Sequence, residues 1–301
     1  MDNDSNLKKT LVKVYKNIRF KLDYSGMELM QEEDGNLYIA SLLKADKSFM
    51  VGRFGAVEMR CVSRWMARMN YTVQELSQAK DAAGIFPNTP DIINQFCEVY
   101  TESMKDCDVL GVWEVVGEKK AISKYCKNVV LIPSRSIEPY YFEVPWSRYL
   151  SEKKVLIVHP FADTIKSQIL QRNLIWPHKD ILPEFRNVSF VKSVQSNAGA
   201  DSGFDNWFNA LDYMKSEIAK KDFDVAIVGA GAYGFPLCSF IKSIGKQAIQ
   251  MSGATQILFG IKGKRWDSHP VISEFYNDAW VRPSKNETPP EITKVEGGSY
   301  W

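Results

Sequence analysis

The sequence predicts an α/β protein whose strands form mostly parallel sheets flanked by helices. Two observations carry this prediction. Short apolar runs, rich in β-branched residues, alternate along the chain with segments of helical periodicity. Most of these runs are continuously apolar, which is typical of parallel strands that are buried on both faces. A chain of 301 residues is long enough for one large domain or for two tightly joined ones.

The first half of the chain begins with helical periodicity over residues 1–47. The α/β pattern then covers residues 48–150 and closes with a loop rich in proline and aromatic residues at 133–150. The elements expected in between are a strand at 48–55, a helix at 56–69, a helix that opens at Thr89 and Pro90, strands at 108–113 and 128–133, and a short helix at 117–126.

The second half, residues 151–281, restarts the alternation with a buried strand led by lysine. Its expected elements are strands at 153–161, 188–196, 224–231 and 246–253, and helices at 163–171, 206–220 and 233–244. Residues 282–301 contain three prolines and end in GGSYW, so we expect a mostly irregular tail.

Composition and charge exclude several classes of protein. The 38 basic and 36 acidic residues give a net charge of +2, which creates no basic field, so we expect no nucleic-acid partner. The five cysteines contain no C-x-x-C pair, which argues against a disulfide scaffold or a zinc ribbon and fits reduced thiols in the cytosol.

Two further features of the sequence also favour a location in the cytosol. The N-terminal residues MDNDSNLKKT lack the basic start and apolar core of a signal peptide. The uncharged stretch at 225–241 is interrupted by glycine and proline and is shorter than the roughly 20 residues of a membrane span. We therefore expect a cytoplasmic protein without a transmembrane segment, and peripheral contact with the inner face of a membrane stays open.

Ligands of parallel α/β folds bind at the carboxyl ends of the strands, and this rule selects the candidate site residues. One selected turn has the pattern G-x-G-x-x-G in Gly229, Gly231 and Gly234, between a strand and a helix. Such glycines permit a tight turn, and the helix N-terminus attracts phosphate. A dinucleotide site also needs an acid at the end of the next strand, where Gln250 stands. A nucleotide or sugar-phosphate contact, simple strand–helix packing and an NAD(P) site all stay open.

The turn after the first strand holds Gly52, Arg53, Gly55 and Glu58. An arginine and a glutamate at one strand end suit a diphosphate together with a hydroxyl group or a metal. The structural alternative is an Arg–Glu ion pair that braces the turn.

Two further groups of polar residues follow strands of the second half. His159 ends an apolar strand, where an imidazole either has a structural hydrogen-bond partner, acts as a base or donates to phosphate. Asp163 either serves the same pocket or caps the next helix. Lys262 and Arg265 lie beyond the last strand, where they either neutralise a phosphate or form a solvated loop.

Several segments together carry a family resemblance that covers the chain from about residue 48 to its end. They are VGRFGAVEMR, FPNTPDII, DVLGVW, SIEPYYFEVPWSRYL, KKVLIVHPFADTIKSQ, VGAGAYGFPL, GATQILFGIKGKRWD, WVRPS and VEGGSYW. These segments resemble a bacterial family that accompanies polysaccharide-assembly genes and has a GT-D-type glycosyltransferase fold. The resemblance implies that 48–150 is a GT-D-like half and that 151–281 is a second, Rossmann-like half.

The resemblance also implies an activity and a departure from it. The enzymes with this fold transfer sugars from nucleotide-sugar donors, and an Arg-Phe-Gly segment followed by Asp-x-Glu serves a divalent metal. This chain keeps Arg53, Phe54, Gly55 and Glu58 but has Ala56 where the first acid stands. Glu58 is then the one carboxylate left for Mn²⁺ or Mg²⁺, which favour several oxygen ligands, so metal dependence is in question.

The expected function is therefore a hexosyltransferase-type glycosyltransferase of surface-polysaccharide or glycoprotein assembly. Its partners would be a nucleotide sugar and a glycan, lipid-linked or protein acceptor. The catalytic candidates are Glu58, His159 and Asp163, and the nucleotide-binding candidates are Gly52, Arg53, Gly55, Gly229, Gly231, Gly234, Lys262 and Arg265. The alternatives are a non-catalytic sugar-nucleotide or glycan-binding protein of the same machinery, and an NAD-dependent sugar-modifying enzyme.

Overall fold

The computed structural model describes residues 24–301, and the helical prediction for residues 1–23 lies outside them. Within the described part, helix α2 (Glu32–Lys44) confirms the helical expectation for its own residues, whereas residues 24–31 form a turn and an isolated bridge at Leu29 instead of a helix. No helix among these residues is long and apolar enough to cross a membrane.

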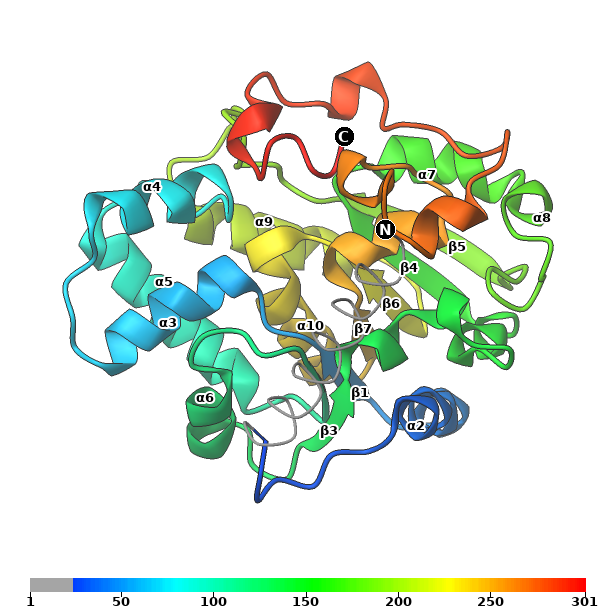
Figure 1. Cartoon of the computed structure of the whole chain (residues 1–301), viewed down its shortest axis with the longest axis horizontal. Helices are drawn as coiled ribbons and strands as arrows, with labels where there is room; N and C mark the ends of the chain where they lie inside the picture. Colours follow the sequence, from blue (N-terminus) through cyan, green and yellow to red (C-terminus); the bar gives the residue numbers. More distant parts are fainter. Residues whose placement is uncertain (1–23) are drawn as a thin grey trace, which may run out of the picture.

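The fold is built on one seven-stranded sheet in which every strand pair is parallel (Figure 1). The strand order is β3-β2-β1-β7-β6-β4-β5. The strands are β1 (Phe49–Gly52), β2 (Val109–Val112), β3 (Val130–Pro133), β4 (Lys154–His159), β5 (Asn187–Lys192), β6 (Val225–Val228) and β7 (Gln247–Gln250). The prediction of a parallel α/β fold is confirmed, and the β1–β7 pair joins the strands of the two chain halves.

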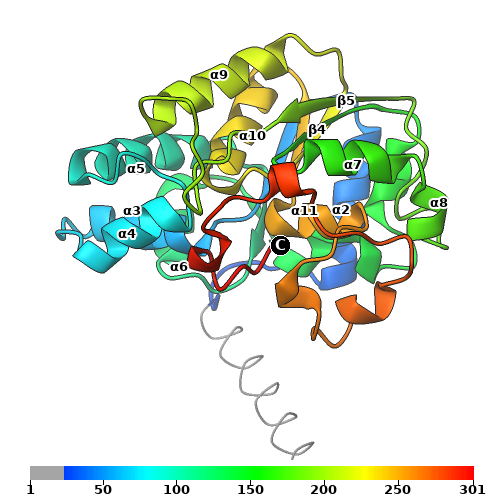
Figure 2. The same ribbon diagram turned by 90° about the horizontal axis from the view of Figure 1, so that it is seen from above.

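Helices cover both faces of the sheet, as Figure 2 shows. Each strand of the centre sends alternate side chains into two separate cores, because successive residues of a strand point to opposite faces. In β6, Ala226 and Val228 enter one core, whereas Val225 and Ile227 enter the other. The remaining helices are α3 (Ala56–Met66), α4 (Val73–Asp81), α5 (Pro90–Met104), α6 (Glu118–Tyr125), α7 (Ala162–Ile169), α8 (Arg172–Ile175), α9 (Trp207–Ala219), α10 (Gly234–Ser243) and α11 (Thr255–Leu258).

Helix α4 is absent from the sequence prediction. It begins at a capping box in which the Thr72 side chain accepts the Glu75 amide and the Glu75 side chain accepts the Thr72 amide. The other expected elements are present, mostly with ends that differ by a few residues, and β5 is shorter than the expected strand at 188–196.

The order of the strands contains a reversal between β4 and β6. From β4 the chain moves outward to the edge strand β5, whereas from β6 it moves in the opposite direction to β7. Neighbouring strands whose connections diverge in this way leave a crevice outside their carboxyl ends. The β4–β6 boundary is therefore where the topology favours a ligand.

The last residues of the sequence cross this carboxyl edge (Figures 1 and 2). We call residues 284–301 the strap. It contains 3-10 turns at Lys285–Glu287 and Ile292–Lys294 and is otherwise irregular, as the sequence predicts. The sequence did not predict its packing: the Glu291 amide donates to the Ala198 carbonyl, and the Arg265 amide donates to the Ser299 carbonyl.

Candidate functional site

The carboxyl ends of β4, β6 and β7 meet at Gly229. A Cβ at this position would lie 2.6 Å from His159 Cδ2, 2.6 Å from Thr255 Oγ1 and 2.8 Å from the Ser252 carbonyl oxygen. Only glycine permits so close an approach of the three strand ends. Ser252 itself has a φ of 53°, a left-handed conformation that a serine seldom adopts and that often accompanies a functional site.

His159 is held at this junction as a neutral hydrogen-bond donor. Its ring is 3% exposed, and its Nδ1 accepts the backbone N–H of Phe161 at 2.9 Å. Burial lowers its pKa from 6.5 to about 3. Because Nδ1 accepts and the ring is neutral, the proton resides on Nε2, which has no hydrogen-bond partner among residues 24–301. The geometry favours donation to a ligand over the role of a base.

The three glycines of the β6–α10 turn divide into two kinds. Gly229 and Gly234 serve packing, since a Cβ at Gly234 would lie 3.0 Å from Gln250 Nε2. Gly231 is exposed and has a φ of 52°, and a Cβ there would meet nothing within 4 Å. In the part of the chain that the structure describes, the amides of Ala230 and Gly231 donate to no protein acceptor. This turn therefore presents backbone donors next to His159.

Gln250 occupies the position where a dinucleotide site has its ribose-binding acid. Its side chain is buried, and its Oε1 accepts the backbone N–H of Arg53 at 3.2 Å. The amide thus joins β7 to the turn after β1 and faces the protein interior. Neither its chemistry nor its position suits a ribose.

The turn between β1 and α3 places Arg53 against an ion-pair partner. Arg53 Nη1 lies 3.1 Å from Glu138 Oε1, and the Tyr140 hydroxyl donates to the other carboxylate oxygen at 2.8 Å. The guanidinium also lies 5.8 Å from the ring centroid of Trp113. The expected Arg–Glu brace exists, but Glu138 supplies the carboxylate and Glu58 does not.

Glu58 folds back over the turn that precedes its own helix. Its carboxylate lies where a Cβ of residue 55 would stand, which explains the glycine at that position. Glu58 is buried, and burial raises the pKa of its carboxyl group, while the amides of Val57 and Glu58 lower it. The negative charge of Glu296 on the strap raises the same pKa.

These donors do not fit a divalent metal. Glu58 is a single carboxylate whose burial favours the protonated form. Glu296 is held 3.6 Å from the guanidinium of Arg265, and residues 24–301 contain no group of three potential metal ligands. Mn²⁺ and Mg²⁺ require more oxygen ligands than this set offers.

The strap closes over the site through Tyr300. The Tyr300 hydroxyl accepts a hydrogen bond from Arg265 Nη1 at 3.0 Å. A Cβ at Gly253 would lie 2.5 Å from the tyrosine ring. Burial raises the pKa of Tyr300, and the charges of Arg265, Arg53 and Glu58 also act on it. The strap therefore brings together residues that the sequence places more than 200 positions apart.

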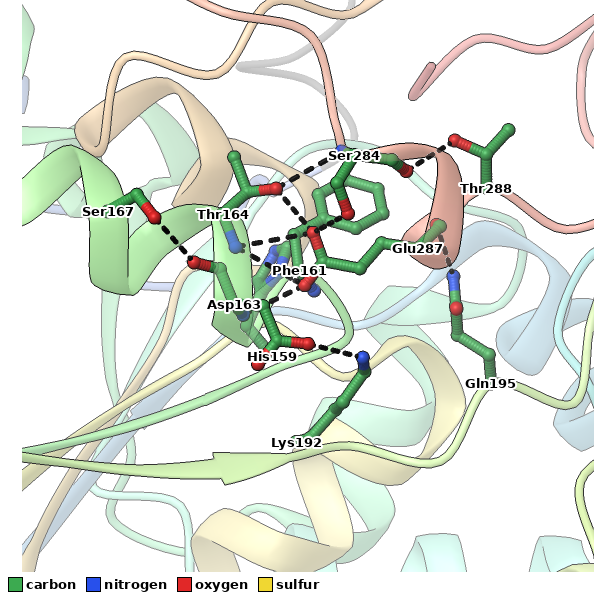
Figure 3. A network of polar contacts seen from close by, with 10 residues as sticks. All are labelled: His159, Phe161, Asp163, Thr164, Ser167, Lys192, Gln195, Ser284, Glu287 and Thr288. Atoms are coloured by element: carbon green, nitrogen blue, oxygen red, sulfur yellow. Dashed lines mark hydrogen bonds and ion pairs between the residues drawn. The ribbon is translucent and has the colours of Figure 1, made fainter.

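A buried carboxylate fastens the start of the strap to helix α7 (Figure 3). Glu287 is fully buried and accepts the amides of Asp163, at 2.8 Å, and Thr164, at 3.3 Å, together with the Thr164 hydroxyl. The Ser284 hydroxyl donates to it at 2.9 Å. Glu287 thus fills the N-terminus of α7, which is unavailable to a ligand phosphate.

Two of the predicted site residues lie apart from this arrangement. The Asp163 side chain is 69% exposed, and its Oδ2 lies 2.7 Å from Lys192 Nζ (Figure 3). The Lys262 ammonium lies 5.3 Å from the ring centroid of Tyr276. Of the predicted cations beyond β7, Arg265 is the one that contacts the Tyr300 hydroxyl.

The tryptophans divide in a way that the sequence does not reveal. From the sequence alone, four of them could either stack on a sugar or a base or pack in the core, and all four are buried in the cores: Trp146, Trp176, Trp207 and Trp266. Trp113, at the end of β2, is 41% exposed and faces Arg53. Finding it requires the strand order, which makes β2 the neighbour of β1.

Comparison with known proteins gives one similarity of shape. No protein-family model matches the chain, and no curated protein matches it. One solved structure is similar in shape: that of the highly conserved domain of unknown function 1792, which is described as having a distinct glycosyltransferase fold. The alignment covers 87% of this chain and 92% of the chain in that structure. The identity is 11% and the TM-score is 0.47. The parallel α/β fold of this chain is assigned from its own sheet.

Proposed function

We propose that this protein is a glycosyltransferase that binds a nucleotide-activated sugar at the carboxyl edge of its sheet. One observation carries the proposal: donors without a partner among residues 24–301 lie at neighbouring strand ends where the topology reverses. They are the Nε2–H of His159 and the amides of Ala230 and Gly231, at the ends of β4 and β6. The resemblance of the sequence to GT-D-type enzymes supports the same class of reaction.

The arrangement suits a diphosphate. Backbone amides and a neutral imidazole N–H donate to phosphate oxygens without adding a charge that must be buried. Arg265 donates to the Tyr300 hydroxyl of the strap and Arg53 stands in the β1–α3 turn, so both guanidinium groups border the proposed site. Together these groups would stabilise the negative charge of a departing nucleoside diphosphate.

Transfer would proceed by displacement at the anomeric carbon. The bond from that carbon to the diphosphate oxygen breaks, and the oxygen keeps the electron pair. An acceptor hydroxyl oxygen forms the new bond, and its proton passes to the carboxylate of Glu58. Burial raises the pKa of Glu58, so its carboxylate, when ionised, is a stronger proton acceptor than an exposed one. Because the donors do not fit a metal, the arginines take the role of neutralising the leaving group.

The physiological substrates we propose are those of surface-polysaccharide or glycoprotein assembly, with a glycan, lipid-linked or protein acceptor. They follow from the family resemblance and not from the geometry. Asp163 is left out of the proposed chemistry because its carboxylate is paired with Lys192.

A non-catalytic sugar-nucleotide-binding protein is the second candidate. The observation that favours it is the burial of Glu58 together with Ala56, which leaves one carboxylate at the turn. An NAD-dependent enzyme finds less support, since Gln250 fills the position of the ribose-binding acid and braces Arg53.

Two measurements test the proposal. A calorimetric panel of nucleoside diphosphates, nucleotide sugars and NAD(P) identifies the ligand class. Release of nucleoside diphosphate from the bound nucleotide sugar, with wild type compared to Glu58→Gln, then separates the candidates. If the protein is a transferase, wild type releases the nucleoside diphosphate and Glu58→Gln releases it at least about tenfold more slowly. A binding protein instead leaves the nucleotide sugar intact.

A further inference from the structure

Trp113 is a large apolar side chain that the fold leaves in solvent. It follows β2 directly, and the residue is 41% exposed, in contrast to the five tryptophans buried in the cores. Exposing an indole has a free-energy cost, because apolar area in contact with water is unfavourable. Residues 24–301 therefore leave part of this side chain uncovered and open to a ligand.

The indole is fixed in place, and the Arg53 guanidinium lies 5.8 Å from its ring centroid. Its Nε1–H donates to the Phe54 carbonyl at 2.8 Å, and its backbone N–H donates to Glu118 at 3.3 Å. The following residue, Glu114, has a φ of 64°, so the chain turns away sharply after the tryptophan. An aromatic ring that is held rigidly before a ligand arrives loses little conformational freedom on binding.

The neighbours of Trp113 belong to the proposed reaction site. Phe54, which accepts the indole hydrogen bond, stands between Arg53 and Gly55 in the β1–α3 turn. That turn also leads to Glu58, the proposed proton acceptor. Arg53 lies between the indole on one side and Glu138 on the other. The exposed ring thus borders the part of the site where the sugar would react.

We propose that Trp113 is a stacking platform for the pyranose ring of the nucleotide-sugar donor. The inference rests on the proposed function and adds the residue that binds the sugar. A pyranose has one face of C–H groups that covers an aromatic ring and a rim of hydroxyl groups that need hydrogen bonds. Trp113 offers the apolar surface, and the Arg53–Glu138 pair offers donors and acceptors beside it.

The position favours the sugar over the nucleobase. Gly231 and His159 lie at the ends of β6 and β4, and the strand order places β7 and β1 between them and β2. The proposed proton acceptor Glu58 must lie beside the reacting sugar, and Trp113 borders the β1–α3 turn that leads to Glu58. The base extends from the other end of the diphosphate. The donor sugar is therefore the part of the ligand that meets the indole.

The test separates sugar binding from nucleotide binding. Calorimetric affinities are measured for UDP, UDP-glucose, UDP-N-acetylglucosamine, GDP and GDP-mannose with wild type, Trp113→Ala and Trp113→Phe. Val116→Ala is the matched control, because Val116 lies in the same loop and is also exposed. Thermal unfolding of each variant checks that the fold is intact.

We expect Trp113→Ala to lower the affinity for the nucleotide sugar by about tenfold relative to wild type. Burying part of an aromatic face is worth about that factor. The matching nucleoside diphosphate should change by less than about twofold, and Trp113→Phe and Val116→Ala should keep most of the affinity. Equal losses for both ligands would show a base platform or a brace of the β1–α3 turn and overturn the inference. Unchanged affinity for the nucleotide sugar would also overturn it.

The outcome for wild type keeps this inference distinct from the proposed function. Wild type that binds none of the five compounds contradicts both the function and the role of Trp113. Wild type that binds a nucleotide sugar, with variants that bind it equally well, contradicts the role of Trp113 alone.

Discussion

The Nδ1 of His159 accepts the backbone N–H of Phe161 at 2.9 Å, and this bond determines which nitrogen faces a ligand. The ring is neutral because burial lowers its pKa to about 3, so its single proton is on Nε2. The strand end thereby carries a fixed donor at the β4–β6 crevice. A base would need an unprotonated nitrogen with a free lone pair, whereas Nδ1 already accepts the Phe161 amide and Nε2 carries the proton.

His159 also makes stability depend on pH. The unfolded chain binds a proton near pH 6.5, whereas the folded chain binds it only near pH 3. Between these values the unfolded state holds more protons, so stability is lost as the pH falls through this window, at up to about 1.4 kcal/mol per pH unit. Urea unfolding of wild type and His159→Gln at several pH values measures the effect. The variant should have the flatter profile, and parallel profiles would show that folding does not lower the pKa of His159.

Glu287 should be the main anchor of the strap. Replacing it by alanine leaves the amides of Asp163 and Thr164 and the hydroxyls of Thr164 and Ser284 without their acceptor. The expected loss is about 3 kcal/mol or more in the free energy of unfolding.

Lys285→Ala in the same 3-10 turn is the control for Glu287, since Lys285 is exposed. It should change stability by no more than about 0.5 kcal/mol. Limited proteolysis of Glu287→Ala should cut within 284–301 at protease concentrations that leave wild type intact. A variant as stable and as resistant as wild type would refute the anchoring role.

Arg53→Ala should weaken the binding of nucleoside diphosphates without unfolding the protein. A charged hydrogen bond is worth about 1.5–3 kcal/mol, and Arg53 stands in the turn between the proposed sugar and diphosphate sites. The ion pair with Glu138 complicates the change, because removal of Arg53 leaves a partly buried carboxylate. Arg53→Ala combined with Glu138→Gln removes that complication. If the double variant binds as wild type does, Arg53 is only a brace.

Metal should matter little to ligand binding by wild type. EDTA is expected to leave the affinity for UDP or GDP nearly unchanged, because Glu58 is a single buried carboxylate and a divalent metal needs several oxygen ligands. Ala56→Asp restores the Asp-x-Glu spacing and should make affinity rise with Mn²⁺ and fall without it. Titrations of both proteins in EDTA and in Mn²⁺ provide the comparison. A wild type that depends strongly on Mn²⁺ would mean that other groups complete a metal site.

The strand pattern and the carboxyl-edge rule predict much of this architecture. Continuous apolar runs predict β1, β4 and β6, and the rule then selects His159 and the 229–234 turn from the sequence alone. Periodicity succeeds here because burial on both faces leaves a strong signal in the sequence. Helix α4 has its own signal in Thr72 and Glu75, although its polar face obscures the periodicity.

Long-range contacts set the limit of that prediction. Glu287 in the irregular tail contacts Thr164, which lies 123 positions earlier, and local sequence says nothing about such a pair. The exposure of Trp113 depends on the neighbouring strand, and the partner of Arg53 is a glutamate 85 positions away. The roles of Gly229 and Gly234 as packing residues likewise depend on His159 and Gln250, which come from other strands.

The most direct test of this account is a calorimetric comparison of nucleoside diphosphates with NAD⁺ on wild-type protein. The Nε2–H of His159 and the amides of Ala230 and Gly231 should bind a diphosphate, whereas Gln250 gives no ribose-binding acid. We predict binding of UDP or GDP with a dissociation constant in the micromolar range, about −8 kcal/mol, and no detectable binding of NAD⁺. Micromolar binding of NAD⁺ with no response to any nucleoside diphosphate would contradict the account.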